Sequence, residues 1–206
     1  MTTAMIKSAV LAVLLTATTS VAQEILEDPS GLISATAGKI FDQINTQRAA
    51  IVKDPTIAES IVRNDLLPLM DIHYSARLIL GREARRASPE QLNTFAVAMN
   101  DLLISRYASG LLEFRSKEQI EVLEFKGTIN PKATPVKTRV RLDSGGYAQV
   151  DYVFRMTDDG WKIFDVVVEG ISYIVSFRNQ IKQEVSANGL DAVIERLTSG
   201  DLDLAG

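Results

Sequence analysis

The sequence predicts an α+β fold in which helices cover one face of a twisted, four-stranded antiparallel sheet. Three observations lead to this prediction. Apolar residues recur at helical spacing from residue 31 to about 114, alternate with polar residues between about 119 and 168, and return to helical spacing after Gly170. Short turns separate the alternating segments, which is typical of an antiparallel meander.

Three helices are predicted in the first part of the chain. An apolar stripe from Ile33 to Ile51 predicts a helix over residues 31–52. Asp54-Pro55 starts a second helix, which Pro68 ends because the residue before a proline avoids the helical region. Asp71 then opens a short third helix that stops at Gly81.

The strongest helix signal begins at Ser88-Pro89-Glu90-Gln91, which is a capping box with proline in the first turn. A helix over residues 89–114 would span roughly 39 Å at 1.5 Å per residue, so we expect it to be the backbone of the helical layer. Its apolar stripe consists of Leu92, Phe95, Ala96, Met99, Leu102, Leu103, Tyr107, Leu111 and Phe114.

Strands are predicted over residues 121–127, 136–142, 147–156 and 161–168, with turns at 143–146 and 157–160. Gly170 breaks the last strand. A long helix is expected from Gly170 to Asn188-Gly189, followed by a small closing helix that contains Leu190 to Leu197.

The N-terminal residues 1–22 have the pattern of a secretory signal peptide, since Lys7 precedes an apolar stretch and small residues lead to Ala22. A membrane anchor would need about 20 continuous apolar residues, and threonine and serine interrupt this stretch. We therefore expect cleavage after Ala22 and one exported domain over residues 23–206. The chain has no cysteine, so no disulfide braces it.

Signals for nucleic-acid binding, metal binding and catalysis are weak. The formal net charge of −4 argues against a nucleic-acid partner. One histidine, no cysteine and no glycine-rich phosphate loop predict no metal and no cofactor, and they make enzyme activity a weak interpretation. His73 is interpreted as a partly exposed side chain rather than a general base. Asp165 interrupts an apolar strand, where pairing with Arg178 or capping of the next helix is favoured over a role as a pocket base.

We interpret two further charged features mainly as solvent-exposed side chains or as contributors to local structure. Lys137, Arg139 and Arg141 share one strand face and predict a solvated row, with contact to an anionic surface or partner as the alternative. Glu169 precedes the helix that Gly170 opens, where the helix dipole favours an anion.

The stretch Trp161-Lys162-x-x-Asp165-Val166-x-x-Glu169-Gly170-x-Ser172, followed by Arg178 and Gln180, resembles the MlaC family. The resemblance extends upstream to Leu80-Gly81-Arg82, Ser88–Gln91, Phe95 and Tyr107, and it covers residues 32–198. The chain departs from the family at Tyr173, Ser176-Phe177 and Ala84, and these differences affect the expected shape of the pocket and the identity of its lipid.

The resemblance implies a periplasmic phospholipid-binding protein, of the group also called toluene-tolerance auxiliary proteins. It implies an NTF2-like sheet, a deep apolar cavity that holds acyl tails, and no catalysis. The expected partners are phospholipid, an outer-membrane lipoprotein–porin complex and an inner-membrane ABC transporter with an MCE-domain ring. The implied role is a monomeric shuttle that maintains outer-membrane lipid asymmetry and supports tolerance of organic solvents.

Alternation and helical phase then predict which residues line this cavity. They place it between strands 147–156 and 161–168 and helices 89–114 and 170–187. Three other interpretations stay open: a solid core, a pocket enzyme that uses Asp165 or His73 on a hydrophobic substrate, and a structural adaptor of an envelope complex. The predicted lipid-binding residues are Leu103, Tyr107, Val150, Tyr152, Phe154, Ile163, Val166, Val168, Ile171, Ile174, Val175 and Phe177.

Overall fold

A computed structural model of the chain describes residues 27–113, 116–142, 145–202 and 204. The predicted signal peptide and Phe114 lie outside these residues. None of the described helices has both the length and the apolar character that crossing a membrane requires.

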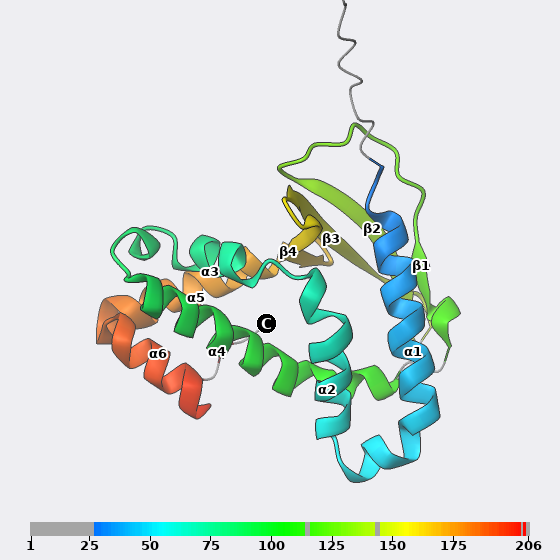
Figure 1. Cartoon of the computed structure of the whole chain (residues 1–206), viewed down its shortest axis with the longest axis horizontal. Helices are drawn as coiled ribbons and strands as arrows, with labels where there is room; N and C mark the ends of the chain where they lie inside the picture. The colour runs from blue at the N-terminus through cyan, green and yellow to red at the C-terminus, as the bar shows by residue number, and fades with distance from the viewer. Residues whose placement is uncertain (1–26, 114–115, 143–144, 203, 205–206) are drawn as a thin grey trace, which may run out of the picture.

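The structure confirms the α+β class, with helices before and after one antiparallel sheet (Figure 1). The helices are α1 Ser30–Lys53, α2 Thr56–Asp65, α3 Ile72–Leu80, α4 Pro89–Tyr107, α5 Tyr173–Asn188 and α6 Leu190–Ser199. The strands are β1 Ile120–Val122, β2 Thr134–Arg141, β3 Tyr147–Thr157, β4 Gly160–Val168 and β5 Ile171–Ser172. Short 3-10 turns include η1 Leu67–Leu69, η3 Ala108–Glu113 and η4 Lys117–Gln119.

Helices α1 and α2 form a hairpin beside the sheet (Figure 1). The Asp54 carboxylate accepts hydrogen bonds from the backbone N–H and hydroxyl of Thr56 and so starts α2. Lys39 and Gln43 on α1 both contact the carboxylate of Asp65 at the end of α2. The hydrogen bond from Lys39 lowers the pKa of Asp65. The hairpin is thus closed at one end by a turn and joined at the other by a polar contact.

Helices α3, α4, α5 and α6 pack together as one helical layer. The buried centre of this layer includes Phe95, Met99 and Phe177. The capping box of α4 is confirmed, since Gln91 N–H donates to Ser88 Oγ and Ser88 N–H donates to Gln91 Oε1. The α-helix ends at Tyr107 and continues as the 3-10 turn η3, so the predicted helix to residue 114 is too long. Ser109 and Gly110 have low helix propensity, and beyond them Leu111 and Leu112 pack against the α1–α2 hairpin.

The sheet has five strands in the order β1-β2-β3-β4-β5, so the prediction of four was one short. The residues of β5 were predicted to belong to the start of the long helix, α5. Glu169 and Gly170 have φ values of 50° and 79°, and they form a two-residue turn that pairs Ile171 with Val168. The chain pairs with β4 for two residues before α5 begins at Tyr173. The predicted first strand also shortens to Ile120–Val122.

The strand register defines an inner face of the sheet, because residues directly opposite each other on paired strands share a face. Tyr152 lies opposite Val136 and Val166, Val150 opposite Thr138 and Val168, and Phe154 opposite Thr134 and Ile163. An irregularity between Val153 and Phe154 brings Ile163 into this row. Ile33 of α1 packs into the cluster formed by Val136, Phe154 and Ile163, so α1 covers part of the inner face.

The outer face carries the predicted basic row. Lys137, Arg139 and Arg141 are exposed, as expected. Arg139 donates two hydrogen bonds to the Glu121 carboxylate, at 2.7 and 3.0 Å, and its guanidinium lies 4.7 Å from the centre of the Tyr147 ring. Within the described residues the row is therefore partly neutralised by its neighbours.

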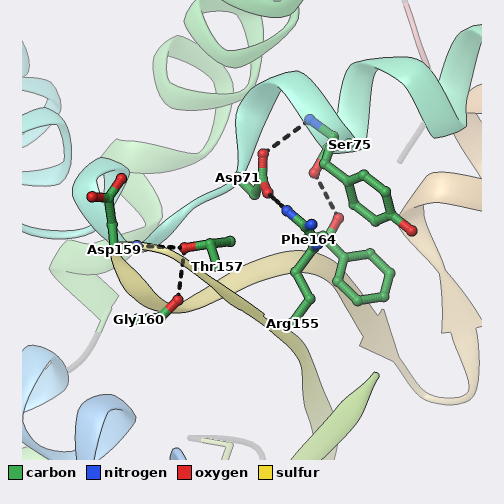
Figure 2. A network of polar contacts seen from close by, with 8 residues as sticks. Asp71, Ser75, Arg155, Thr157, Asp159, Gly160 and Phe164 are labelled. Carbon is green, nitrogen blue, oxygen red and sulfur yellow. Dashed lines mark hydrogen bonds and ion pairs between the residues drawn. The ribbon is translucent and has the colours of Figure 1, made fainter. Parts of the chain in front are cut away.

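A polar junction joins the beginning of α3 to β3 and β4 (Figure 2). Asp71 N–H donates to the Ile163 carbonyl at 2.7 Å, and the Asp71 carboxylate caps α3 and pairs with Arg155. The Arg155 guanidinium lies 4.4 Å from the centre of the Tyr74 ring. Ser75 Oγ donates to the Phe164 carbonyl at 2.7 Å. These contacts fix the position of the helical layer relative to the end of the sheet.

Candidate functional site

A cavity of about 110 Å³ lies between α1 and the inner face of the sheet. Its wall combines residues of α1, β1 and β3 with residues that follow α2 and α4. None of the described residues that line it is charged, so this part of the wall suits an apolar or neutral ligand. The lining residues are Ile33, Thr36, Ala37, Ile40, Phe41, Ile44, Leu66, Leu111, Ser116, Ile120 and Tyr152.

Tyr152 is the largest polar side chain in this wall. It lies deep in the protein, and desolvation raises the pKa of its phenol above the ordinary value of 10.0. The side chain keeps partial accessibility because it lines the cavity. We therefore expect the phenol to remain neutral and able to donate a hydrogen bond at neutral pH.

A second cavity of about 70 Å³ lies between α3, α4, α5 and β4. Leu103, Val166, Ile174 and Phe177, four of the residues predicted to bind lipid, line it, and so does Tyr173. The linings of the two cavities meet at Tyr152 and Val166, which lie opposite each other on β3 and β4.

In place of the expected single deep cavity, the described fold has two small cavities beside the sheet. Sites for small molecules typically enclose about 300–1,000 Å³. The cavities of about 110 and 70 Å³ are smaller, so a two-chain lipid requires their walls to move apart. Phe154 and Ile163 are 0% exposed and packed against Ile33, which means that side chains fill the space beside the cavities.

Exposure of the predicted residues rises along the inner face toward one end of the sheet. Val150 and Val168 are half-buried, and Ile171, paired with Val168, is 63% exposed. Val175, one turn into α5, is 50% exposed. None of these four residues is among the described lining residues of either cavity, and Ile171 and Val175 are largely exposed to solvent.

A row of aromatic side chains runs from the surface to the second cavity. The ring centres of Tyr107 and Tyr173 are 6.5 Å apart, and those of Tyr173 and Phe177 are 5.7 Å apart. Tyr107 is 42% exposed, whereas Phe177 is buried. Burial, together with the neighbouring Tyr107, raises the pKa of Tyr173. Tyr173, one of the departures from the family pattern, therefore lies between the surface and the cavity.

The contribution of α1 to the site was missed at the level of sequence. Its stripe predicted a helix, but a stripe does not specify which face of the sheet the helix covers. Met70 and Phe164 also line the second cavity without having been predicted. Phe164 lies where the irregularity between β3 and β4 shifts the alternation, and no local pattern marks that shift.

Asp165 has a structural role in the described fold. Its carboxylate accepts hydrogen bonds from Ser172 Oγ at 2.6 Å and from Ile174 N–H at 3.1 Å, at the beginning of α5. Helix capping is thus the correct alternative, and pairing with Arg178 is not observed because Arg178 Nε donates to the Leu78 carbonyl. His73 is exposed. No cluster of metal-ligating side chains occurs in the described ranges.

A larger hollow of about 460 Å³ lies at the connection between β1 and β2. Glu124, Lys126 and Lys137 are among its lining residues. Its charged wall distinguishes it from the two uncharged or nearly uncharged cavities beside the inner face.

Two sequence comparisons extend over most of the chain. The intermembrane phospholipid transport system binding protein MlaC of Haemophilus influenzae is 25% identical over 173 residues, which cover 82% of this chain and 80% of that protein. The toluene tolerance protein ttg2D of Pseudomonas putida is 24% identical over 166 residues, which cover 80% of this chain and 76% of that protein.

A solved structure has a similar fold. It is a phospholipid-binding protein from Ralstonia solanacearum in complex with a phospholipid, and it matches with a TM-score of 0.75 at 19% identity. The match covers 84% of this chain and 96% of that chain. The profile of the MlaC protein matches residues 34–199, from the first turns of α1 to the end of α6. Since this match includes all the main helices and the whole sheet, the chain belongs to the MlaC family.

Proposed function

We propose that this protein binds a phospholipid between the inner face of the sheet and the covering helices, and that it carries the lipid through an aqueous compartment. The observation that carries the proposal is the apolar inner face, bordered by two cavities whose described lining residues include no lysine or arginine. The names of the relatives from Haemophilus and Ralstonia, which describe phospholipid transport and phospholipid binding, support it.

The energetics of acyl chains favour a buried site. Two acyl chains contain on the order of 30 methylenes at about 0.8 kcal/mol each, so exposing them to water would cost more than about 20 kcal/mol. A carrier must bury most of this surface. Because the membrane offers similar burial, the net free energy of transfer between membrane and carrier is small, and partners must set the direction of transport.

The exposed apolar residues Ile171, Val175 and Tyr107 suit the rim of the site. Ile171 pairs with Val168 at the end of the inner face where Val150 and Val168 become accessible. Val175 follows in the first turn of α5, and the Tyr107 ring lies near that of Tyr173 at the start of the same helix. In this proposal the tails pass this rim and occupy the region between the two cavities, with the head group left in water.

The finer role that we propose is a monomeric periplasmic shuttle. Such a shuttle moves phospholipid between an outer-membrane lipoprotein–porin complex and an inner-membrane ABC transporter with an MCE-domain ring. It would maintain outer-membrane lipid asymmetry and tolerance of organic solvents. Residues 1–22 would direct export and be removed after Ala22. The protein itself would act without a cofactor and without catalysis.

The decisive experiment measures bound lipid. Gently purified protein is extracted and the extract is analysed by mass spectrometry, with about one phospholipid per chain expected. Val166→Trp should abolish loading, because Val166 lines the second cavity and the larger ring fills it. Val52→Trp is the matched control, since Val52 is an exposed residue at the end of α1. Wild-type protein that stays free of lipid after incubation with phospholipid vesicles would contradict the proposal.

A further inference from the structure

Tyr152 carries a hydroxyl group that the described fold leaves unused. No hydrogen-bond partner for its phenol oxygen occurs among the described residues. The fully buried hydroxyls of the sheet are paired: Thr134 Oγ1 donates to the Asn130 carbonyl at 2.7 Å, and Thr138 Oγ1 donates to the Val150 carbonyl at 2.6 Å. No fully buried side-chain oxygen or nitrogen of the described residues lacks a partner, so the Tyr152 oxygen keeps some accessible surface. An accessible, unpaired phenol in a cavity wall points to a ligand or to water.

The position of Tyr152 fits the middle of a bound lipid. It lies two residues along β3 from Val150, a step of about 7 Å toward the interior. Val150 is half-buried near the proposed rim, and Phe154, two residues further, is fully buried. Tyr152 is therefore located between the end where a head group would meet water and the region where tails would be buried.

The chemistry of the cavity limits what the phenol can bind. None of the described residues that line the cavity is charged, so among them a phosphate group would be buried without a cation and at high cost. A hydrocarbon chain would leave the phenol unpaired. A neutral acceptor satisfies both conditions, and the ester carbonyl that joins an acyl chain to glycerol is such an acceptor. In the lipid-free protein, the cavity of about 110 Å³ has room for a water molecule that accepts the hydrogen bond instead of the ester carbonyl.

The hydroxyl of Thr36 lies in the same cavity wall, on α1. It too has no hydrogen-bond partner in the described part of the chain, whereas Ser116 Oγ accepts from Glu118 N–H at 3.2 Å. Two hydroxyl groups, one from the sheet and one from the helix that covers it, are thus available to a ligand.

We propose that the Tyr152 phenol donates a hydrogen bond to an acyl ester carbonyl of the bound phospholipid, and that it thereby makes the protein selective for ester-linked over ether-linked lipids. The inference rests on the proposed function, because it assigns a polar contact within the same lipid site. Thr36 provides a second hydroxyl to the same region of the lipid.

A competition experiment tests this contact. Delipidated protein is incubated with vesicles that contain equal amounts of a diester phosphatidylglycerol and its diether analogue with identical chains, and the bound lipids are quantified by mass spectrometry. The net value of one hydrogen bond predicts about a two- to tenfold preference of the wild type for the diester. Tyr152→Phe should lose the preference while still loading lipid. Tyr147→Phe, which removes an exposed phenol on the outer face, should keep it.

The outcomes separate this contact from the proposed function. Equal loading of both lipids by the wild type, or an unchanged preference in Tyr152→Phe, would overturn the contact while leaving phospholipid binding intact. Equal loss of both lipids in Tyr152→Phe would also overturn it, since the partner would then be a group that the two lipids share. Failure of the wild type to load either lipid would refute the proposed function itself. Infrared spectroscopy of carbonyl-labelled lipid bound to the wild type offers a test without any variant. The ester carbonyl band should lie at a lower frequency than that of an ester carbonyl without a hydrogen bond.

Discussion

Asp165 illustrates how a residue that suggests catalysis can serve the fold. A carboxylate inside an apolar strand is costly to bury unless it is paired. Here the carboxylate accepts hydrogen bonds from Ser172 Oγ and Ile174 N–H, so it holds the beginning of α5 against β4. The residue therefore connects the last strands to the helix that lines the second cavity.

Replacing Asp165 by alanine should lower stability rather than remove a reaction. Loss of a helix cap costs about 0.5–2 kcal/mol, and Ser172 would lose its partner as well. We expect Asp165→Ala to reduce the free energy of unfolding by about 1–3 kcal/mol in urea denaturation. Asp159→Ala, in the exposed turn before Gly160, is the control for removing a carboxylate. An unchanged denaturation midpoint for Asp165→Ala would show that the cap contributes nothing.

Tyr152 should make stability depend on alkaline pH. Because burial raises the pKa of its phenol, the unfolded chain releases this proton near pH 10 while the folded chain retains it. The folded state binds more protons there, so its stability falls as the pH rises from about 10 toward the folded pKa, by at most about 1.4 kcal/mol per pH unit. Urea denaturation of Tyr152→Phe between pH 8 and 11 should give a shallower decline than wild type. Parallel declines in the two proteins would rule out this linkage.

At the scale of elements, the turn between β4 and β5 decides where α5 begins. The two-residue turn needs positive φ at both Glu169 and Gly170, and it brings Ile171 back against β4 before the helix starts. The same turn places Ile171 at the exposed end of the inner face. Because Ile171 and Ser172 form β5 and α5 begins only at Tyr173, the Ile171 side chain reaches the proposed rim.

The turn can be tested by comparing two glycines. At Gly170 the φ of 79° disfavours any side chain, although a Cβ would meet no atom within 4 Å, so Gly170→Ala should destabilise by about 1–2 kcal/mol through backbone strain. Gly38 lies inside α1, where a Cβ also meets nothing within 4 Å. Gly38→Ala should stabilise by about 0.5–1 kcal/mol. Thermal or urea denaturation reports both signs, and stabilisation by Gly170→Ala would disprove the strain.

At the scale of the whole molecule, the buried apolar residues of the described chain form three clusters. One lies within the α3–α6 layer, one between α1, α2 and the end of α4, and one between the sheet and Ile33. The α3–α6 layer, the α1–α2 hairpin and the inner face of the sheet therefore each have a buried apolar cluster. A ligand that separates the sheet from its covering helices would disrupt the third cluster most, while the polar junction of Asp71 and Arg155 holds the layers together beside it (Figure 2).

Much of the fold was accessible from sequence because its signals are local. The capping box at Ser88, the cap at Asp71 and the prolines near helix ends depend on residues within one turn of each other. Strand β5 was not accessible, since a two-residue strand has no periodicity and its partner is fixed only by the turn. The end of α4 at Tyr107 was also missed. The apolar stripe continues past it to Leu111, which packs against the α1–α2 hairpin from the 3-10 turn η3.

The sequence by itself determined the class of fold, the order of its main elements and the apolar character of the strands, since each depends on periodicity along the chain. The tertiary structure decided that α1 covers part of the inner face, that two small cavities stand in place of the expected single one, and that the Tyr152 hydroxyl has no partner among the described residues. The physical reason is that periodicity identifies an apolar face, whereas the gap left between two such faces depends on how side chains distant in the sequence pack together.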